Sequence, residues 1–91
     1  MAVVEVTTGV TLEQYLAVKE RVRERNGPVA GRLLQVCYGE DEDLRIVTVY
    51  ETEAAYDAFN EGVLAKVLAD LEYVDIPYES HLLSAHDVTT G

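Results

Sequence analysis

The chain has 91 residues, of which 48% are hydrophobic and 26% are charged, and this is the size and composition of one globular domain. Its 17 acidic and 7 basic residues give a formal net charge of −10. Such a surface repels phosphates, so we expect no nucleic-acid partner and no membrane partner. The single cysteine, Cys37, excludes an intramolecular disulfide and a four-cysteine zinc site, and we expect a cytoplasmic protein.

The first third of the chain predicts a strand followed by a helix. The β-branched run AVVEV, residues 2–6, indicates a short strand. Thr11 and Gln14 have the spacing of a helix capping box, and the sequence NGP at 26–28 ends the helix. Its buried side is predicted from apolar residues at helical spacing: Leu12, Tyr15, Leu16 and Val22.

The middle of the chain predicts a β-hairpin followed by a second helix. Two apolar runs, residues 31–39 and 44–51, flank a short acidic turn, which favours an antiparallel hairpin. Thr52 can cap the next helix. We expect an interruption of this helix at the sequence NEG, residues 60–62, because glycine costs about 1 kcal/mol in a helix interior. A fourth strand is predicted over residues 80–88.

The resulting order, βαββαβ, is that of a ferredoxin-like α+β domain, in which two helices cover one face of a four-stranded antiparallel sheet. The strand sequences RLLQVC, RIVTVY and HLLSA place apolar side chains on both faces of that sheet. An uncovered face would expose an apolar patch above a few hundred Å². We therefore expect a single domain over residues 1–91 and a homodimer that forms through the sheet faces.

A strand that ends in an aromatic residue, Glu and Thr runs into a helix of the pattern Glu-x-Ala-aromatic-x-x-Phe: Tyr50, Glu51, Thr52, Glu53, Ala55, Tyr56 and Phe59. Over residues 31–71 the chain resembles small bacterial members of the dimeric α+β barrel superfamily, among them the antibiotic-biosynthesis-monooxygenase-like proteins. The resemblance implies a dimer with a cavity between sheet and helices in each subunit. Such relatives include cofactor-free monooxygenases, polyketide cyclases, lactone isomerases, haem-degrading oxygenases and non-catalytic binding domains. The chain lacks the Trp that haem-degrading relatives carry, which argues against haem degradation.

Two residues are candidate catalytic groups for such a cavity. His81, between apolar residues of the fourth strand, can act as a general base because the ordinary pKa of histidine is near 6.5. The alternative is a histidine hydrogen-bonded at a strand end. Tyr50, at the end of the third strand, is the second candidate.

Candidate substrate-binding residues combine aromatic and apolar walls with one amide: Gln35, Tyr15, Tyr56, Phe59, Val47 and Val49. In the expected hairpin register Gln35 lies opposite Val47 and near Val49, so its amide needs a partner from a ligand, the backbone or water. For the aromatic residues, ordinary core packing is the alternative interpretation.

Together these features predict a cofactor-independent enzyme, which is a monooxygenase, cyclase or isomerase acting on a small hydrophobic aromatic or polyketide-like compound. The sequence contains no phosphate-binding glycine loop and no paired-histidine metal motif, so we expect neither cofactor nor metal. A non-catalytic ligand-binding or stress-response module and a dimerisation scaffold stay open as alternatives. An enzyme should contain a pocket of roughly several hundred Å³ with converging polar groups, whereas a scaffold should have a filled interior.

Overall fold

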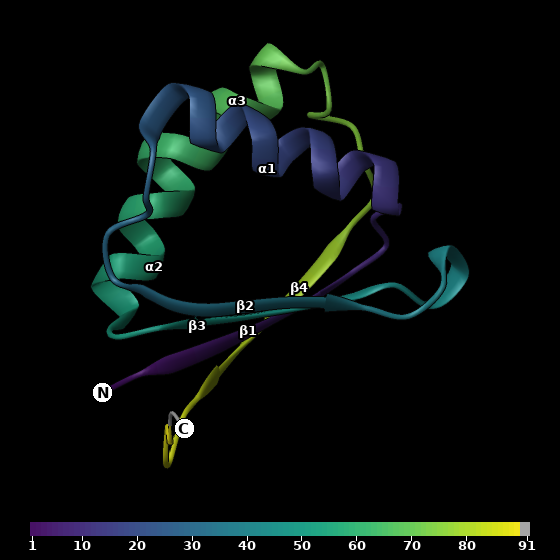
Figure 1. Cartoon of the computed structure of the whole chain (residues 1–91). Helices are drawn as coiled ribbons and strands as arrows, with labels where there is room; N and C mark the ends of the chain where they lie inside the picture. The colour runs from purple at the N-terminus through teal and green to yellow at the C-terminus, as the bar shows by residue number, and fades with distance from the viewer. Residues whose placement is uncertain (90–91) are drawn as a thin grey trace.

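The computed structural model describes residues 1–89, in which four strands form one antiparallel sheet with the helices on one of its faces (Figure 1). The spatial order of the strands is β2-β3-β1-β4. Their bounds are β1 (Val3–Thr8), β2 (Arg32–Tyr38), β3 (Arg45–Tyr50) and β4 (Glu79–Ser84). This architecture confirms the predicted ferredoxin-like α+β fold. Strand β4 ends earlier than expected because its neighbour β1 begins at Val3, which pairs with Ser84.

Helix α1 (Leu12–Asn26) begins with the predicted capping box. The Thr11 hydroxyl accepts a hydrogen bond from the Gln14 N–H at 3.1 Å, and the Gln14 side chain accepts one from the Thr11 N–H at 2.9 Å. The predicted buried side was only partly right, because Leu12 and Leu16 are about half exposed while Val22 is buried. At 100° per residue, Leu12 and Leu16 lie about 80–120° round the helix from Val22.

The second helical segment is continuous but changes its hydrogen-bonding pattern in the middle. It consists of α2 (Glu53–Phe59), a π-helical stretch η2 (Asn60–Leu64) and α3 (Ala65–Asp70). The π-helix falls on the Asn-Glu-Gly sequence at which an interruption was predicted, and the Asn60 side chain donates to the Tyr56 carbonyl at 2.9 Å. Wider π turns of this kind occur often at functional sites. None of the helices in residues 1–89 has the length and hydropathy that crossing a bilayer requires.

The hairpin of β2 and β3 is antiparallel as predicted, but its register differs by one residue from the expected one. Gln35 pairs with Thr48, so both side chains point toward the helices. Val47 and Val49 consequently point to the helix-free face. The prediction that Gln35 lies among these two valines was wrong, because the 3-10 turn η1 (Asp41–Asp43) sets a different alignment of the strands.

A β-bulge at the start of β2 turns Arg32 toward the helices. Arg32 pairs with Tyr50, and the register shifts between Arg32 and Leu34, which leaves Leu33 as an extra residue. Strict alternation from Gln35 would instead have placed Arg32 on the helix-free face.

The residue before this bulge has to be a glycine. Gly31 has a φ of +78°, in the region that side chains disfavour, and a Cβ there would lie only 2.5 Å from the Cβ of Ala55. Its carbonyl accepts a hydrogen bond from the Glu51 N–H at 2.8 Å. The close approach of α2 therefore fixes the backbone from which Arg32 projects.

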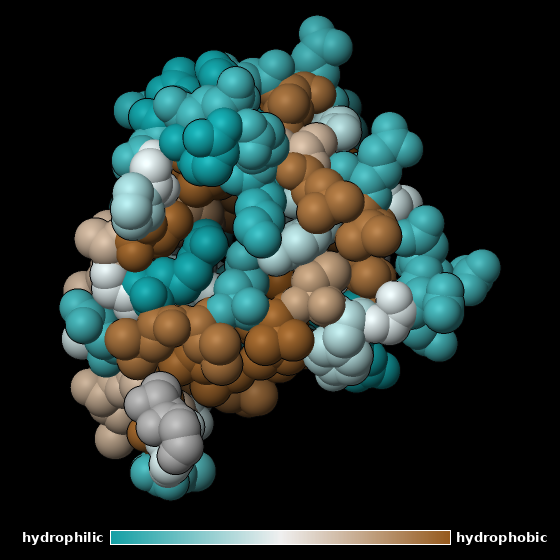
Figure 2. All heavy atoms as spheres, in the orientation of Figure 1, coloured by the Kyte–Doolittle hydropathy of each residue, from teal (hydrophilic) through white to brown (hydrophobic). Residues whose placement is uncertain are grey.

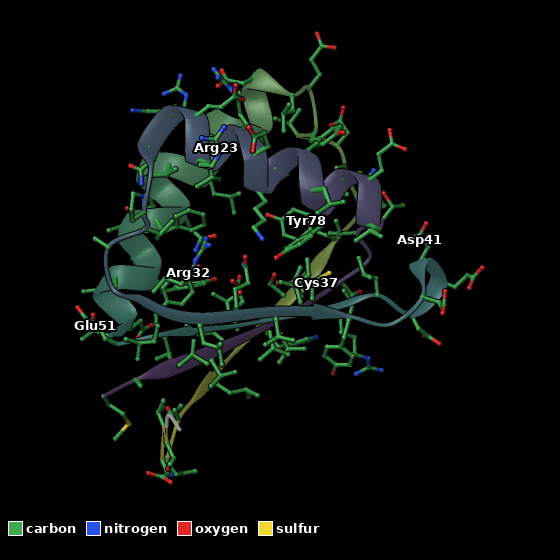
Figure 3. All side chains as sticks on the ribbon, in the orientation of Figure 1. Arg23, Arg32, Cys37, Asp41, Glu51 and Tyr78 are labelled. Carbon is green, nitrogen blue, oxygen red and sulfur yellow. The ribbon has the colours of Figure 1, made fainter. Side chains whose placement is uncertain are left out.

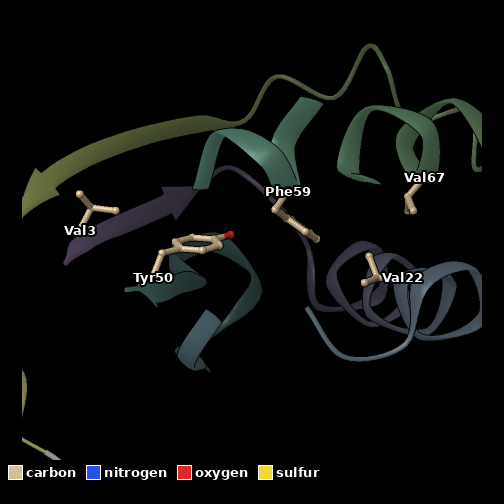
Figure 4. Close-up of a cluster of buried hydrophobic side chains, with 5 residues drawn as sticks. All are labelled: Val3, Val22, Tyr50, Phe59 and Val67. Atoms are coloured by element: carbon tan, nitrogen blue, oxygen red, sulfur yellow. The ribbon is translucent and has the colours of Figure 1, made fainter. Parts of the chain in front are cut away.

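Five buried side chains form the hydrophobic core between sheet and helices: Val3, Val22, Tyr50, Phe59 and Val67 (Figure 4). Val67 and Tyr50 are 0% and 1% exposed. The Tyr50 ring meets the edge of Tyr56 at a centroid distance of 5.5 Å and lies 6.3 Å from Phe59. Contacts of this kind add roughly 0.5–1.5 kcal/mol beyond the burial of the rings.

The opposite face of the sheet, which we call the open face, carries mainly apolar side chains: Val4, Val6, Leu34, Val36, Tyr38, Arg45, Val47, Val49, His81 and Leu83. Several of its large residues, from Leu34 at the β2 edge to Leu83 at the β4 edge, are between 43% and 56% exposed. Figure 2 shows apolar atoms gathered over the sheet, low in the view. The apolar side chains predicted for the face without helices are therefore present.

Candidate functional site

A cavity of about 120 Å³ lies between the sheet and the helices. Its walls are apolar on the helix side, with contributions from Val18, Val22, Phe59, Leu64, Leu68 and Ile76. Its floor is the sheet, from which mostly polar side chains project: Glu5, Thr7, Arg32, Gln35, Thr48 and Ser80. Apolar walls with a few placed polar groups are typical of ligand sites. The volume is smaller than predicted and approaches that of a cavity of about 150 Å³ that holds one benzene ring.

A hydrogen-bonded network crosses this floor and is centred on Gln35. The Tyr15 hydroxyl of α1 donates to the Gln35 side-chain oxygen at 3.2 Å, and the Gln35 side-chain nitrogen donates to the Thr48 hydroxyl at 3.0 Å. The protein thus supplies the partners that the buried amide needs. Tyr15 and Gln35 are held in fixed positions at the cavity wall.

Arg32 reaches into the same region from β2, as Figure 3 shows. Its guanidinium carbon lies 4.9 Å from the centre of the Phe59 ring, and its Nη1 donates to Gln35 at 3.4 Å. The Arg32 Nε is buried and has no hydrogen-bond acceptor in the part of the chain that the structure describes. Within residues 1–89 no carboxylate forms an ion pair with Arg32.

Among residues 1–89, Glu5 of β1 is the only acidic side chain that lines the cavity. Burial raises the pKa of its carboxyl above the ordinary value, while the Ser80 hydroxyl and the positive charge of Arg32 partly offset this effect. A carboxyl group with a raised pKa can exchange a proton with a bound ligand nearer to neutral pH than an exposed one can.

Tyr50 is a neutral phenol at physiological pH. Burial raises the pKa of Tyr50 to about 12, and the negative charge of Glu5 adds to this rise, with Arg32 acting in the opposite direction. Burial likewise raises the pKa of Tyr15. Both hydroxyls are therefore suited to donating a hydrogen bond, and neither is suited to removing a proton as a phenolate.

Four of the predicted site residues line the cavity: Tyr15, Gln35, Tyr50 and Phe59. Tyr56 lies one step away, with its ring against the edge of Tyr50.

Three other predicted site residues, His81, Val47 and Val49, do not face the cavity, so this placement was wrong. His81 pairs with Val6, and both residues point to the open face, since strand residues alternate and Ser80 takes the cavity side. The exposed His81 therefore has no access to the cavity from its position in β4.

Three charged cavity residues, Glu5, Lys19 and Arg32, were missed. Glu5 carried a usable signal, because it is the one charged residue inside the apolar run of residues 2–6. Arg32 carried none, because only the bulge brings it to this face. No cluster of three or more His, Cys, Asp or Glu side chains within residues 1–89 is placed to hold a metal ion.

No family model and no curated protein sequence matches the chain. Solved structures do match it over nearly its whole length. Rv0793 from Mycobacterium tuberculosis superposes with a TM-score of 0.71 at 13% identity, covering 99% of this chain and 100% of that one. A mutant of SnoaB, a cofactor-independent oxygenase from Streptomyces nogalater, gives 0.61 at 15% identity, with 96% and 93% covered.

A third match is the heme-degrading protein Rv3592 from Mycobacterium tuberculosis, with a TM-score of 0.59 at 18% identity and 99% and 100% of the two chains covered. Further matches are provisionally assigned as antibiotic biosynthesis monooxygenases. The chain therefore has the fold of the antibiotic-biosynthesis-monooxygenase-like proteins, and the resemblance seen in the sequence is confirmed at the level of the fold.

Proposed function

We propose that the protein is a cofactor-independent enzyme that acts on a small aromatic or polyketide-like compound in the cavity between sheet and helices. The observation that carries this proposal is the cavity itself, where mainly apolar side chains of the helices face a polar sheet floor, and the Tyr15–Gln35–Thr48 network joins α1 to that floor. The shared fold of SnoaB, a cofactor-independent oxygenase, supports the same reading. A monooxygenase is the leading form, with a cyclase or isomerase as its variants.

In the oxygenase form, each polar group has a defined task. Tyr50 donates a hydrogen bond to a carbonyl or phenol oxygen of the substrate, and Glu5 accepts a proton from an acidic C–H group. The resulting carbanion reduces dioxygen and joins it as a peroxide, which takes the proton back. Loss of water from the hydroperoxide then leaves a carbonyl. Phe59 provides a flat wall for the substrate ring, and Tyr56 holds the Tyr50 ring in place.

The proposal includes a homodimer that forms through the open face. Support comes from the exposed apolar residues of this face, since a water-exposed apolar area spread over four strands is unusual for a monomer. A two-fold contact would cover the same residues on both copies. We place the dimer in the cytoplasm, where a lone thiol such as Cys37 stays reduced.

A non-catalytic ligand-binding module is the second candidate. Its support is the small volume of the cavity. The hydrogen bonds of Gln35 to Tyr15 and Thr48 also fit this function, because a binding site needs ordered polar groups whether or not it catalyses a reaction.

Turnover with labelled dioxygen separates the two functions. Purified protein is incubated aerobically with single-ring and polycyclic phenols or anthrones, and label in the product is measured by mass spectrometry. The enzyme should incorporate label, and Tyr50→Phe should lower the rate by about a hundredfold, as removal of one transition-state donor does. Tyr73→Phe, which removes a hydroxyl outside the cavity, is the control. Binding without any labelled product would instead support the module.

A further inference from the structure

The charge of the cavity differs in sign from the charge of the whole protein. The chain carries 17 acidic residues against 7 basic ones. The cavity wall nevertheless contains two basic side chains, Lys19 and Arg32, and one acidic side chain, Glu5. In a protein with a net charge of −10, a cation-rich cavity favours a negatively charged ligand.

Arg32 also differs from the arginines of α1 in having no carboxylate partner. Arg21 and Arg25 both bind Asp70, each at 2.9 Å, and Arg23 binds Glu20. These ion pairs lie at the surface, where water can also form hydrogen bonds to the guanidinium groups. Arg32 is more enclosed, and its Nε is buried without an acceptor. A partly buried guanidinium without a counter-ion is unfavourable, so an anion at this position would stabilise the fold as well as bind.

Glu5 does not supply that anion, although it lines the same cavity. No ion pair joins Glu5 to Arg32 anywhere in the described chain. The two charges act on each other without direct contact, because burial raises the pKa of Glu5 and the positive charge of Arg32 partly offsets this rise. The guanidinium therefore keeps hydrogen-bond donors for a ligand, among them the buried Nε.

The shape of the site limits the rest of the ligand. The free volume of about 120 Å³ is close to that of a cavity that holds one benzene ring, so a single ring matches it best. The helix side offers mainly apolar side chains near this space, such as Val18 and Leu68, beside the polar residues of α1. The planar guanidinium of Arg32 is matched in geometry by a carboxylate, which can accept two parallel hydrogen bonds.

We propose that the ligand of the cavity is a single-ring organic acid whose carboxylate binds Arg32 and whose ring lies beneath the apolar side chains of the helices. This proposal rests on the proposed function in using the same cavity, and it narrows the substrate class to small aromatic carboxylates.

The test compares benzoate with its neutral analogue benzamide, and with phenol, on the wild-type protein by titration calorimetry and amide NMR. Benzoate should bind at least about tenfold more tightly than benzamide, because a charge-assisted pair is lost in the amide. It should shift the amide signals of β2 and α1 residues around the cavity. Equal affinities, or a preference for phenol, would overturn the proposal.

Substitutions of arginine show which side chain causes the preference for benzoate. Arg32→Gln should remove the preference for benzoate, and Arg32→Lys should keep only part of it. Arg23→Gln, which removes the same charge from the surface, should keep all of it; a loss in Arg23→Gln equal to that in Arg32→Gln would overturn the proposal. The wild-type comparison stands even where Arg32→Gln fails to fold.

The same binding data distinguish a failure of the acid-ligand proposal from a failure of the proposed function. Neutral aromatics that bind in the cavity without any preference for acids would refute the acid ligand and leave the proposed function standing. If no aromatic compound of any charge entered the cavity, both would fail.

Discussion

The two faces of the sheet carry different sets of side chains. The face that the helices cover combines the core residues Val3 and Tyr50 with the polar residues Glu5, Arg32 and Gln35 around a cavity, whereas the open face carries rows of valine and leucine. Sheets that have one covered face normally place their apolar residues under the cover. The apolar rows of the open face are therefore the feature that a partner surface would explain, and the polar groups beside the covered core are the feature that a bound ligand would explain.

The largest effect should come from placing a charge on the open face. Val36→Asp puts a carboxylate among the exposed apolar residues of β2, so a buried charge would have no partner in a face-to-face dimer. We expect the thermal midpoint to fall strongly and to lose its dependence on protein concentration. Val74→Asp is the matched control, because Val74 is an exposed apolar residue outside the sheet. An equal midpoint for the two variants would argue against a covered open face.

The next effect concerns the floor of the cavity. Thr48→Val removes the acceptor of the Gln35 side-chain nitrogen while it increases the hydrophobicity of a residue that is 1% exposed. We expect the free energy of unfolding to fall by about 1–2 kcal/mol, because the amide loses a partner in a buried setting. Denaturant unfolding measures the change. A variant more stable than the wild type would show that the hydrogen bond between Gln35 and Thr48 does not stabilise the fold.

A smaller effect should follow from the charge of Glu5, and it should depend on pH. The folded-state pKa of Glu5 is raised above the ordinary value of 4.5, so its ionised form is disfavoured in the folded protein. Glu5→Gln should therefore raise the thermal midpoint near neutral pH, with the gain disappearing as the pH falls below 4.5, where Glu5 is protonated in both states. Thermal unfolding over a pH series measures this. If the thermal midpoint of Glu5→Gln stayed higher than that of the wild type at low pH, the gain would have a cause other than the ionisation of Glu5.

The smallest effect should come from His81, which points away from the cavity. His81→Ala should leave benzoate affinity and any turnover of the dimer within about twofold of the wild type, since it removes an exposed side chain on the open face. Calorimetry and product formation check this result. A large loss of turnover in a variant that is still dimeric would bring His81 into the chemistry through the partner copy.

Local sequence signals predicted the elements well. The capping box at Thr11, the hairpin and the change of helical pattern before Gly62 all depend on residues close together in the chain. The apolar content of the strands predicted two apolar surfaces for the same reason, because alternation within a strand is a local property.

The site was harder to predict because it depends on how strands align. A shift of one residue in the β2–β3 register moved Val47 and Val49 to the open face, and pairing with β1 did the same for His81. The place of Arg32 depends on the contact between Gly31 and Ala55, which are far apart in sequence. Glu5 alone was visible in advance as a charge within an apolar strand.

Sedimentation equilibrium of the wild-type protein measures whether a second copy covers the open face. We expect a mass twice that of one chain, and this mass should persist on dilution to low micromolar concentration because the second copy covers the apolar rows. A stable, folded species with the mass of a single chain at that concentration would contradict it.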